Sequence, residues 1–333
     1  MNSSENNIKN IKKNGGHFSG WLMVKSVETG VTNMSKQYLN ITFQDVTGTL
    51  DARKWEVYPS DLAILIPGRV VDVEGDIFSY KGQMQMKVLT INDVDQQNVI
   101  MEDFTQSSPL PLDFMKAELA ADIEKIKNDD VRRIVDYLVK SHYEQYTTYP
   151  AAMSFHHAYF GGLLFHSLSI CRMAEKVADN YTFLNRDYLI AGSLLHDIGK
   201  TIELSGNVST SYTNEGKLLG HINIGATLID EAAEQLNIKG EVPLVLEHII
   251  LSHHGVPEFG SAVLPRIAEA YVVHELDDLD SRLNMLGDSL ATIDGGEFSL
   301  KLPGFDGRTF YKIKGTKSVS YTHLRAHETP EHL

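Results

Sequence analysis

The stretch LLHDIGK, from Leu194 to Lys200, decides the fold. It places His196 and Asp197 side by side, directly after an apolar run and shortly before a glycine. Neighbouring side chains on a helix point about 100° apart, so this pair can reach one metal ion together only near a helix end or a distortion. Gly199 supplies such an end. The pair is therefore either the polar end of an ordinary helix or two ligands of one metal ion.

Other histidines along the chain favour the metal interpretation. A lone histidine on a helix is more often a surface or core residue than a ligand, so no single position decides the question. Together, however, histidines and aspartates recur in order along successive helical segments. Imidazole nitrogen and carboxylate oxygen suit Mn, Fe, Co, Ni or Zn. The candidate metal ligands are His166, His196, Asp197, His221, His253, His254 and Asp277.

The order H…HD…H…HH…D, with HDIGK at its centre, resembles the HD superfamily of metal-dependent phosphohydrolases. These are all-α domains that hold one or two divalent metal ions. The resemblance implies that Asp197 bridges two ions. It also favours Asp277 over Asp278 and Asp280, because LDDLD aligns with the family pattern A-D-x-L-D. The implied core motif is His166, His196, Asp197 and Asp277, and the extra ligands of two-metal members would be His221, His253 and His254.

The same resemblance implies how the site would act. Two cations held close together clamp a phosphodiester, lower the pKa of a bridging water and neutralise charge on the leaving oxygen. Lys200 matches a lysine that follows the HD pair in many members, where it would face a phosphate. His157, just before GGLLFH, is a candidate either for a phosphate contact or for simple packing. We expect His196, Asp197 and Lys200 to be the catalytic residues.

The surroundings of the motif have helical periodicity. Seven segments carry apolar residues at helical spacing, which predicts an all-α domain over residues 113–290. Residues 291–317 are rich in Gly and Lys and form a C-terminal extension. The last stretch, SVSYTHLRAHETPEHL (318–333), resembles translated adapter sequence more than a natural disordered tail. We treat it as non-native and leave it out of the fold.

Residues 17–98 have the pattern of strands. They are rich in Val, Ile, Thr and aromatics, are broken by turn signals, and alternate apolar with polar residues in YLNITFQD. About five strands, with a short segment near Pro59–Leu65, predict a small closed Greek-key barrel. We expect residues 1–16 to be a flexible N-terminus and residues 99–112 to be a linker. The predicted fold class is multidomain β + α, a barrel followed by an all-α domain.

The barrel segments QYLNITFQDVTGTLDARKW and GRVVDVEGDIFSYKGQMQMKV resemble the OB-fold of the nucleic-acid-binding type. Such barrels stack bases on aromatic rings and follow the backbone with basic residues. About half of the aromatics in a barrel face its core, so each candidate also has a structural interpretation. Trp55 and Tyr80 are favoured as surface residues. The candidate contacts are Tyr38, Phe43, Trp55, Tyr80, Lys36, Arg53, Lys54 and Lys81.

Charge and composition narrow the class of protein. The chain of 333 residues carries a formal net charge of −14, of which residues 1–98 contribute only −1. This argues against coating of nucleic acid by bulk electrostatics and makes the barrel the less repulsive surface for a polyanion. The single cysteine, Cys171, excludes an internal disulfide framework. Because the sequence has no secretory signal and no long apolar run, we expect a cytoplasmic protein that does not enter the membrane.

An OB-fold followed by an HD domain resembles the YhaM family of bacterial 3′→5′ exoribonucleases, over roughly residues 17–312. The segments that carry this resemblance are YPAAMSFHHAYFGGLLFHSLS, LLHDIGK with the later ELSG, and EGKLLGHI. It implies one or two divalent ions per chain, Mn²⁺ or Co²⁺. It also implies removal of nucleotides from the 3′ end of single-stranded RNA, and in some members of single-stranded DNA.

Two other interpretations stay open. An HD-type phosphodiesterase for nucleotides or cyclic nucleotides would share the fold and the metals. The cyclic di-GMP subgroup carries Gly-Tyr-Pro after its paired histidines, whereas this chain reads HHGVPEFG, and the barrel favours a polymeric substrate. A non-catalytic nucleic-acid-binding protein with a vestigial HD site is the other alternative. The complete set of ligand positions argues against it.

Overall fold

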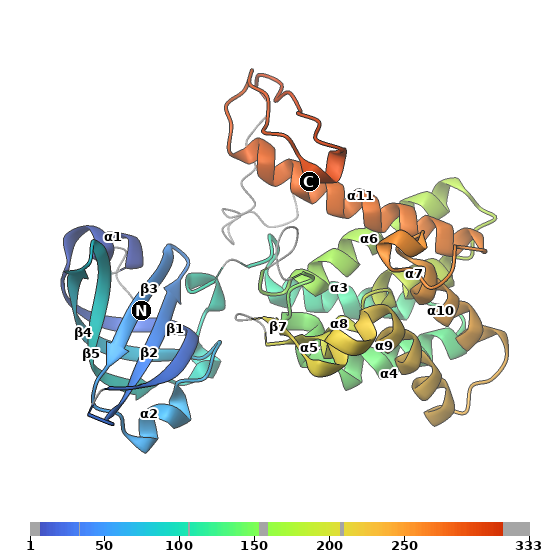
Figure 1. Ribbon diagram of the computed structural model, residues 1–333. Helices are drawn as coiled ribbons and strands as arrows, with labels where there is room; N and C mark the ends of the chain where they lie inside the picture. Colours follow the sequence, from blue (N-terminus) through green and yellow to red (C-terminus); the bar gives the residue numbers. More distant parts are fainter. Residues whose placement is uncertain (1–6, 33, 106, 153–158, 207–209, 316–333) are drawn as a thin grey trace. The chain divides into compact units, whose positions relative to one another are not determined.

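The computed structural model describes residues 7–32, 34–105, 107–152, 159–206 and 210–315. The chain divides into two compact units, one built mainly from residues 1–107 and the other mainly from residues 108–333 (Figure 1). The boundary falls inside the range 99–112, where the sequence predicts a linker. Among the described residues, no helix is both long enough and apolar enough to cross a membrane.

The first unit is a closed barrel with the strand order β1-β2-β3-β5-β4. Neighbouring strands are antiparallel except for β3 and β5, which are parallel. A short helix, α2 (Pro59–Ile64), joins β3 to β4. This is the topology of the OB-fold, so the predicted fold of this domain is confirmed. The strands are β1 (Gly16–Val31), β2 (Gln37–Asp45), β3 (Gly48–Lys54), β4 (Val70–Tyr80) and β5 (Gln83–Asp93).

Alternate residues of each strand fill the barrel, because successive side chains of a strand point to opposite faces. Along β2 the buried apolar positions are Leu39, Ile41 and Phe43. The register of β4 and β5 shifts between Glu74 and Gly75, where Leu89 is the extra residue of a bulge in β5. A Cβ atom on Gly75 would lie 2.6 Å from a backbone oxygen of β5, so a glycine is needed at this close approach.

A helix that the sequence did not predict adds to this barrel. It is α1 (Ile8–Asn14), and its Ile8 and Ile11 side chains are buried in the barrel core. The N–H of Ile8 donates to Oδ2 of Asp45 over 2.7 Å. Ile8 and Ile11 are three residues apart and so lie on one face of the helix. That face packs against the apolar core of the barrel. The prediction of a flexible N-terminus over residues 1–16 is therefore wrong for this segment.

The residues just after β5 still belong to the barrel unit. Two short 3₁₀ helices, η1 (Gln96–Asn98) and η2 (Met101–Asp103), follow the strand. Phe104 is buried against Met23 and Val70. The connection between the units therefore starts after Phe104 and is shorter than the predicted linker.

The second unit consists mainly of helices around an apolar core (Figure 1), which confirms the predicted helical domain. Its one small sheet among the described residues pairs β6 (Leu204–Ser205) with β7 (Ser211–Tyr212). In α4 the residues Val131, Ile134, Val135 and Leu138 recur at spacings of one turn, and all are buried. The helices are α3 (Leu112–Lys125), α4 (Asp129–Ser141), α5 (Tyr143–Thr148), α6 (Gly162–Asn180), α7 (Arg186–Leu195), α8 (Lys200–Glu203), α9 (Asn214–Gln235), α10 (Glu241–Ser252) and α11 (Ala268–Ala291).

The structure refines these predictions at two places. The chain leaves the helical region at His142, so that α4 and α5 are two separate helices. In the C-terminal extension, isolated bridges join Phe298 to Tyr311 and Leu302 to Arg308. The tail over 318–333 lies outside the described residues.

Candidate metal centre

The HD pair lies in the turn between α7 and α8. His196 and Asp197 follow directly after the last residue of α7, and the N–H of His196 still donates to the carbonyl of Gly192 over 2.9 Å. Gly199 allows a close approach at this turn, because a Cβ atom there would lie 2.0 Å from the carbonyl oxygen of His221. The missing side chain lets α9 pack against the turn and brings His221 beside Asp197.

A first group of ligand atoms comes from α6, the HD turn and α11. One ligand atom each from His166, His196 and Asp197 lie within 4.8 Å of one another. Nε2 of His166 is 3.2 Å from Nε2 of His196. Asp277 approaches from α11, with its Oδ1 atom 3.1 Å from Nε2 of His166. The four residues of the implied core motif therefore meet at one point.

A second group comes from α9 and the end of α10. One ligand atom each from His221, His253 and His254 lie within 4.8 Å of one another. The rings of His253 and His254 have their centroids 4.3 Å apart, and those of His221 and His254 are 5.2 Å apart. These are the three positions that match the extra ligands of two-metal members.

Asp197 lies between the two groups, with one oxygen toward each. Its Oδ2 atom is 3.3 Å from Nε2 of His196, in the first group. Its Oδ1 atom is 3.5 Å from Nε2 of His221 and 3.8 Å from Nε2 of His253, in the second. A carboxylate in this position can bind one ion through each oxygen, so the geometry fits the bridging role that the sequence implies.

The donor atoms fit divalent metal ions. Oδ1 of Asp197, Nε2 of His221 and Nε2 of His253 are buried, and none hydrogen-bonds to any other described residue. A buried polar atom without a partner costs roughly 1–3 kcal/mol, so three of them converging on one place need a common partner. A cation satisfies two imidazole nitrogens and a carboxylate oxygen together.

The charge states of Asp197 and His253 also suit metal ligands. Burial alone would raise the pKa of Asp197, but Lys200 and His196 hold it well below its usual range. Burial, together with His254 and His196, lowers the pKa of His253 well below that of a free imidazole. Asp197 is therefore an anion and His253 is neutral at pH 7, which are the states in which these groups bind metal.

Lys200 contacts the bridging carboxylate directly. Its Nζ atom lies 2.7 Å from Oδ2 of Asp197, and its side chain is largely buried. Burial lowers the pKa of Lys200, but the neighbouring Asp197 outweighs that effect and raises it. The lysine therefore keeps its positive charge beside the centre.

Hydrogen bonds to Nδ1 fix the tautomers of the ligand histidines. Nδ1 of His196 lies 3.0 Å from the carbonyl oxygen of Ser193, and Nδ1 of His253 lies 2.7 Å from that of Ile250. A carbonyl oxygen only accepts, so Nδ1 carries the proton and Nε2 keeps its lone pair for a metal.

Two carboxylates absent from the predicted site, Glu203 and Asp280, make the equivalent contacts with His221 and His166. The quoted segments LDDLD and ELSG contain Asp280 and Glu203, but the sequence did not mark either one as a partner of a ligand histidine.

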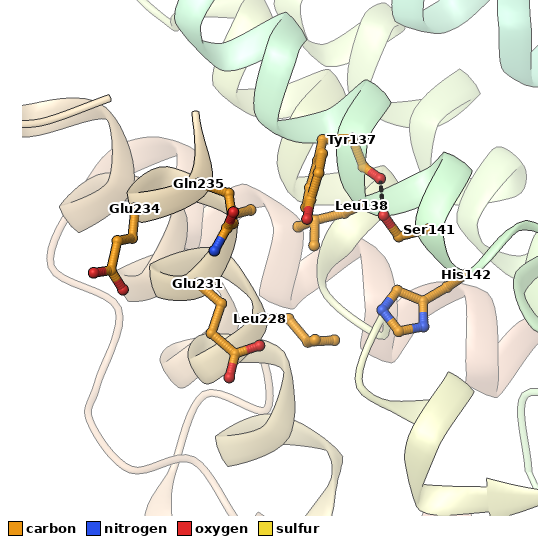
Figure 2. Close-up of a pocket in the computed structure, with 9 residues that line it drawn as sticks. Tyr137, Leu138, Ser141, His142, Leu228, Glu231, Glu234 and Gln235 are labelled. Carbon is orange, nitrogen blue, oxygen red and sulfur yellow. Dashed lines mark hydrogen bonds between the residues drawn. The ribbon is translucent and has the colours of Figure 1, made fainter. Parts of the chain in front are cut away.

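His157, the candidate phosphate contact, lies outside the described residues. A separate surface groove of about 400 Å³ lies between α4 and α9 (Figure 2). Tyr137, His142 and Glu231 contribute to its lining, and no predicted metal ligand does. The groove is therefore distinct from the metal centre.

One face of the barrel carries several predicted nucleic-acid contacts. The rings of Tyr38 and Trp55 lie 5.1 Å apart, and the guanidinium of Arg53 is 6.0 Å and 5.9 Å from their centroids. Gly30 lies beneath Tyr38, because a Cβ atom there would be 2.3 Å from the ring. Trp55 is 46% exposed, so this cluster presents an aromatic surface to solvent.

Three more candidates are also on the barrel surface. Tyr80 is 45% exposed, and the ammonium of Lys81 lies 5.5 Å from its ring centroid. Lys36 is exposed just before β2. These side chains are accessible to a ligand.

Two of the predicted contacts are wrong. Phe43 is fully buried in the barrel core, so its ring cannot stack on a base. Lys54 is only 4% exposed, and its Nζ atom lies 3.5 Å from Oδ2 of Asp61 and 3.4 Å from the carbonyl oxygen of Leu89. Both side chains lie on the inward face of their strand. Packing in the core explains Phe43, and the internal ion pair with Asp61 explains Lys54.

Comparisons with known proteins agree with this arrangement. The family model of the HD domain matches residues 163–282. The 3′-5′ exoribonuclease YhaM of Bacillus subtilis (strain 168) is 41% identical over 293 residues, which are 88% of this chain and 93% of that protein. The protein of the same name from Geobacillus sp. (strain WCH70) is 40% identical over 293 residues, 88% of this chain and 90% of its own.

Among solved structures, the HD domain of the L. monocytogenes phosphodiesterase PgpH aligns with 45% of this chain and 73% of its own, at 17% identity and a TM-score of 0.28. That score is too low to add to the argument. The sequence relatives, in contrast, match at about 40% identity across both the barrel and the helical unit. On that evidence the chain belongs to the YhaM family of 3′-5′ exoribonucleases.

Proposed function

We propose that this chain is a metal-dependent 3′→5′ exoribonuclease whose His/Asp centre hydrolyses the terminal phosphodiester of single-stranded RNA. The observation that carries the proposal is the position of Asp197, whose two oxygens face two different groups of histidines. The polarity of degradation comes from the relatives, which are named 3′-5′ exoribonucleases. The single, buried cysteine is consistent with work in the reducing cytoplasm.

The chain's own residues would hold two divalent ions. His166, His196 and Asp277 supply the first group of donors and the three remaining histidines the second, with Asp197 between them. When bound, such ions supply a hydroxide nucleophile near neutral pH and charge neutralisation on the phosphate. The nitrogen and oxygen donors suit Mn²⁺ or Co²⁺.

Lys200 would act in the same centre as a permanent positive charge. It lies 2.7 Å from the oxygen of Asp197 that faces the first group. An ammonium there offsets the carboxylate charge and can turn toward a phosphate oxygen, because a lysine has three donors on a flexible stem. This is the role that we propose for Lys200 in catalysis.

The barrel would hold the strand. The cluster of Tyr38, Trp55 and Arg53 offers aromatic faces for bases and a cation for the backbone, and Tyr80 with Lys81 offers a second such pair. Stacking on aromatics is tolerant of sequence and does not need a 2′-hydroxyl. We therefore expect single-stranded DNA to bind as well as RNA.

The test is a time course with Mn²⁺ on single-stranded RNA labelled at its 5′ end and resolved on a denaturing gel. We expect a ladder that shortens from the 3′ end, and no ladder with the His196→Ala, Asp197→Ala double variant. A double variant that degrades RNA at the parental rate would disprove the assigned centre. Turnover of bis-p-nitrophenyl phosphate without any cleavage of RNA would instead favour a phosphodiesterase for nucleotides.

A further inference from the structure

Two carboxylates outside the ligand set each contact one of the two histidine groups. Glu203, at the end of α8, lies with Oε1 3.2 Å from Nδ1 of His221. Asp280, on α11, lies with Oδ2 2.8 Å from Nδ1 of His166. Both carboxylates are buried, at 8% exposure each. Each therefore contacts a ligand of a different group.

Glu203 is held in place by the fold around it. The backbone of α9 leaves the helical region at Gly220, with φ 73° and ψ 152°, so a new helical segment starts at His221. Oε1 of Glu203 accepts the backbone N–H of His221 over 3.0 Å and caps that segment. Gly216 packs on the backbone of Glu203, since a Cβ atom there would lie 2.3 Å from its carbonyl oxygen. One carboxylate oxygen thus sets both the backbone and the ring of His221.

Asp280 is fixed in a comparable way. Its Oδ1 atom accepts a hydrogen bond from the hydroxyl of Ser169, one turn after His166 on α6. Its Oδ2 atom is left to face Nδ1 of His166. The carboxylate therefore spans α6 and α11 and orients the histidine whose Nε2 atom lies 3.1 Å from Asp277.

We propose that Glu203 and Asp280 are positioning residues that set the metal affinity of the two halves of the centre separately. This rests on the proposed two-metal function. A carboxylate on Nδ1 fixes the ring and makes Nε2 a stronger donor, and loss of such a partner typically weakens metal binding about 10- to 100-fold. Glu203 acts through the group of His221, and Asp280 acts through the group of His166.

The experiment is a calorimetric titration of the metal-stripped full chain with Mn²⁺, for the parent and for Glu203→Gln, Asp280→Asn and the double variant. These changes keep the size of the side chain and remove its charge. We expect two binding events in the parent. Each single variant should weaken a different event by about 10- to 100-fold and leave the other within about threefold, and the double variant should weaken both.

Matched controls are Asp278→Asn and Glu234→Gln, exposed carboxylates on α11 and α9 that contact no ligand histidine. Both should bind Mn²⁺ as the parent does, and circular dichroism of all variants checks that the helices are intact. Single variants that match the parent, or that weaken both events equally, overturn the positioning roles while the two-metal proposal stands. A parent that binds fewer than two ions overturns the two-metal proposal and this inference with it.

Discussion

At the scale of single residues, the proposed two-metal centre depends most on Asp197. It is buried, it is an anion, and its two oxygens face different groups of histidines. Asn at this position keeps the shape but has one weak donor oxygen and no charge. The centre should therefore depend on the charge and the two oxygens of the carboxylate more than on the size of the side chain.

We predict that Asp197→Asn lowers the initial rate of RNA degradation by on the order of 1,000-fold. When catalytic residues act as one unit, the loss of a single member removes most of the rate enhancement of the whole unit. Initial rates on labelled single-stranded RNA in Mn²⁺ measure this loss. Asp278→Asn is the control, since Asp278 is exposed and pairs with Arg282 on its own helix. A rate for Asp197→Asn within tenfold of the parent contradicts the bridging role.

A second residue supports the HD turn from the core. Tyr146 is fully buried, and its hydroxyl donates to the carbonyl of Leu194, two residues before His196, over 2.7 Å. Tyr146→Phe leaves that carbonyl without its partner, so we predict a loss of about 1–3 kcal/mol in the free energy of unfolding. Urea denaturation measures it. Tyr137→Phe, on an exposed ring, should change stability by less than about 0.5 kcal/mol, and equal effects of the two substitutions would refute the support role.

At the scale of elements, close packing of α9 against the HD turn brings the two ligand groups together. We predict that Gly199→Ala destabilises the chain and weakens Mn²⁺ binding, because its Cβ atom would lie 2.0 Å from the backbone of His221. Thermal unfolding and a Mn²⁺ titration measure both effects. Gly287→Ala in α11 is the control: nothing lies within 4 Å of its Cβ position, so the helix should gain up to about 1 kcal/mol. Parental Mn²⁺ binding by Gly199→Ala would contradict this account.

Most helices and strands could be predicted from the sequence, and the two wrong nucleic-acid contacts could have been avoided. Apolar spacing gave the helices and the barrel strands, because burial of one face leaves a period in the sequence. The same period should have placed Phe43 inside, since it shares the inward set of β2 with Leu39 and Ile41. Lys54 likewise shares the inward set of β3 with Leu50 and Ala52. Residue type alone suggested a surface role for both, and strand alternation was the better guide.

At the scale of the whole molecule, binding and hydrolysis are assigned to different units. We predict that Trp55→Ala weakens binding of single-stranded RNA by about 5- to 100-fold, because stacking of a base on an aromatic ring contributes about 1–3 kcal/mol. Fluorescence anisotropy with a labelled oligonucleotide measures the affinity. Turnover of bis-p-nitrophenyl phosphate should not change. Leu89→Ala, an exposed apolar residue of β5, is the control, and equal RNA affinity for Trp55→Ala and the parent would rule out the stacking role.

The candidate metal ligands could be predicted from the sequence, but the carboxylates that contact them could not. Metal ligands must be particular residue types, so their order along the chain is recognisable. Glu203 and Asp280 contact the ligand histidines only in the folded chain. The sequence does not show which residue a given carboxylate will contact. The segment α1 was missed for the same reason, because only the barrel interior gives its two isoleucines a place to be buried.

The most direct test of the two-metal centre is anomalous diffraction from crystals of the full chain grown with Mn²⁺. We predict two anomalous peaks, one beside His166 and His196 and one beside His221 and His253, each next to a different oxygen of Asp197. A single peak, or peaks that do not contact Asp197, would contradict the account.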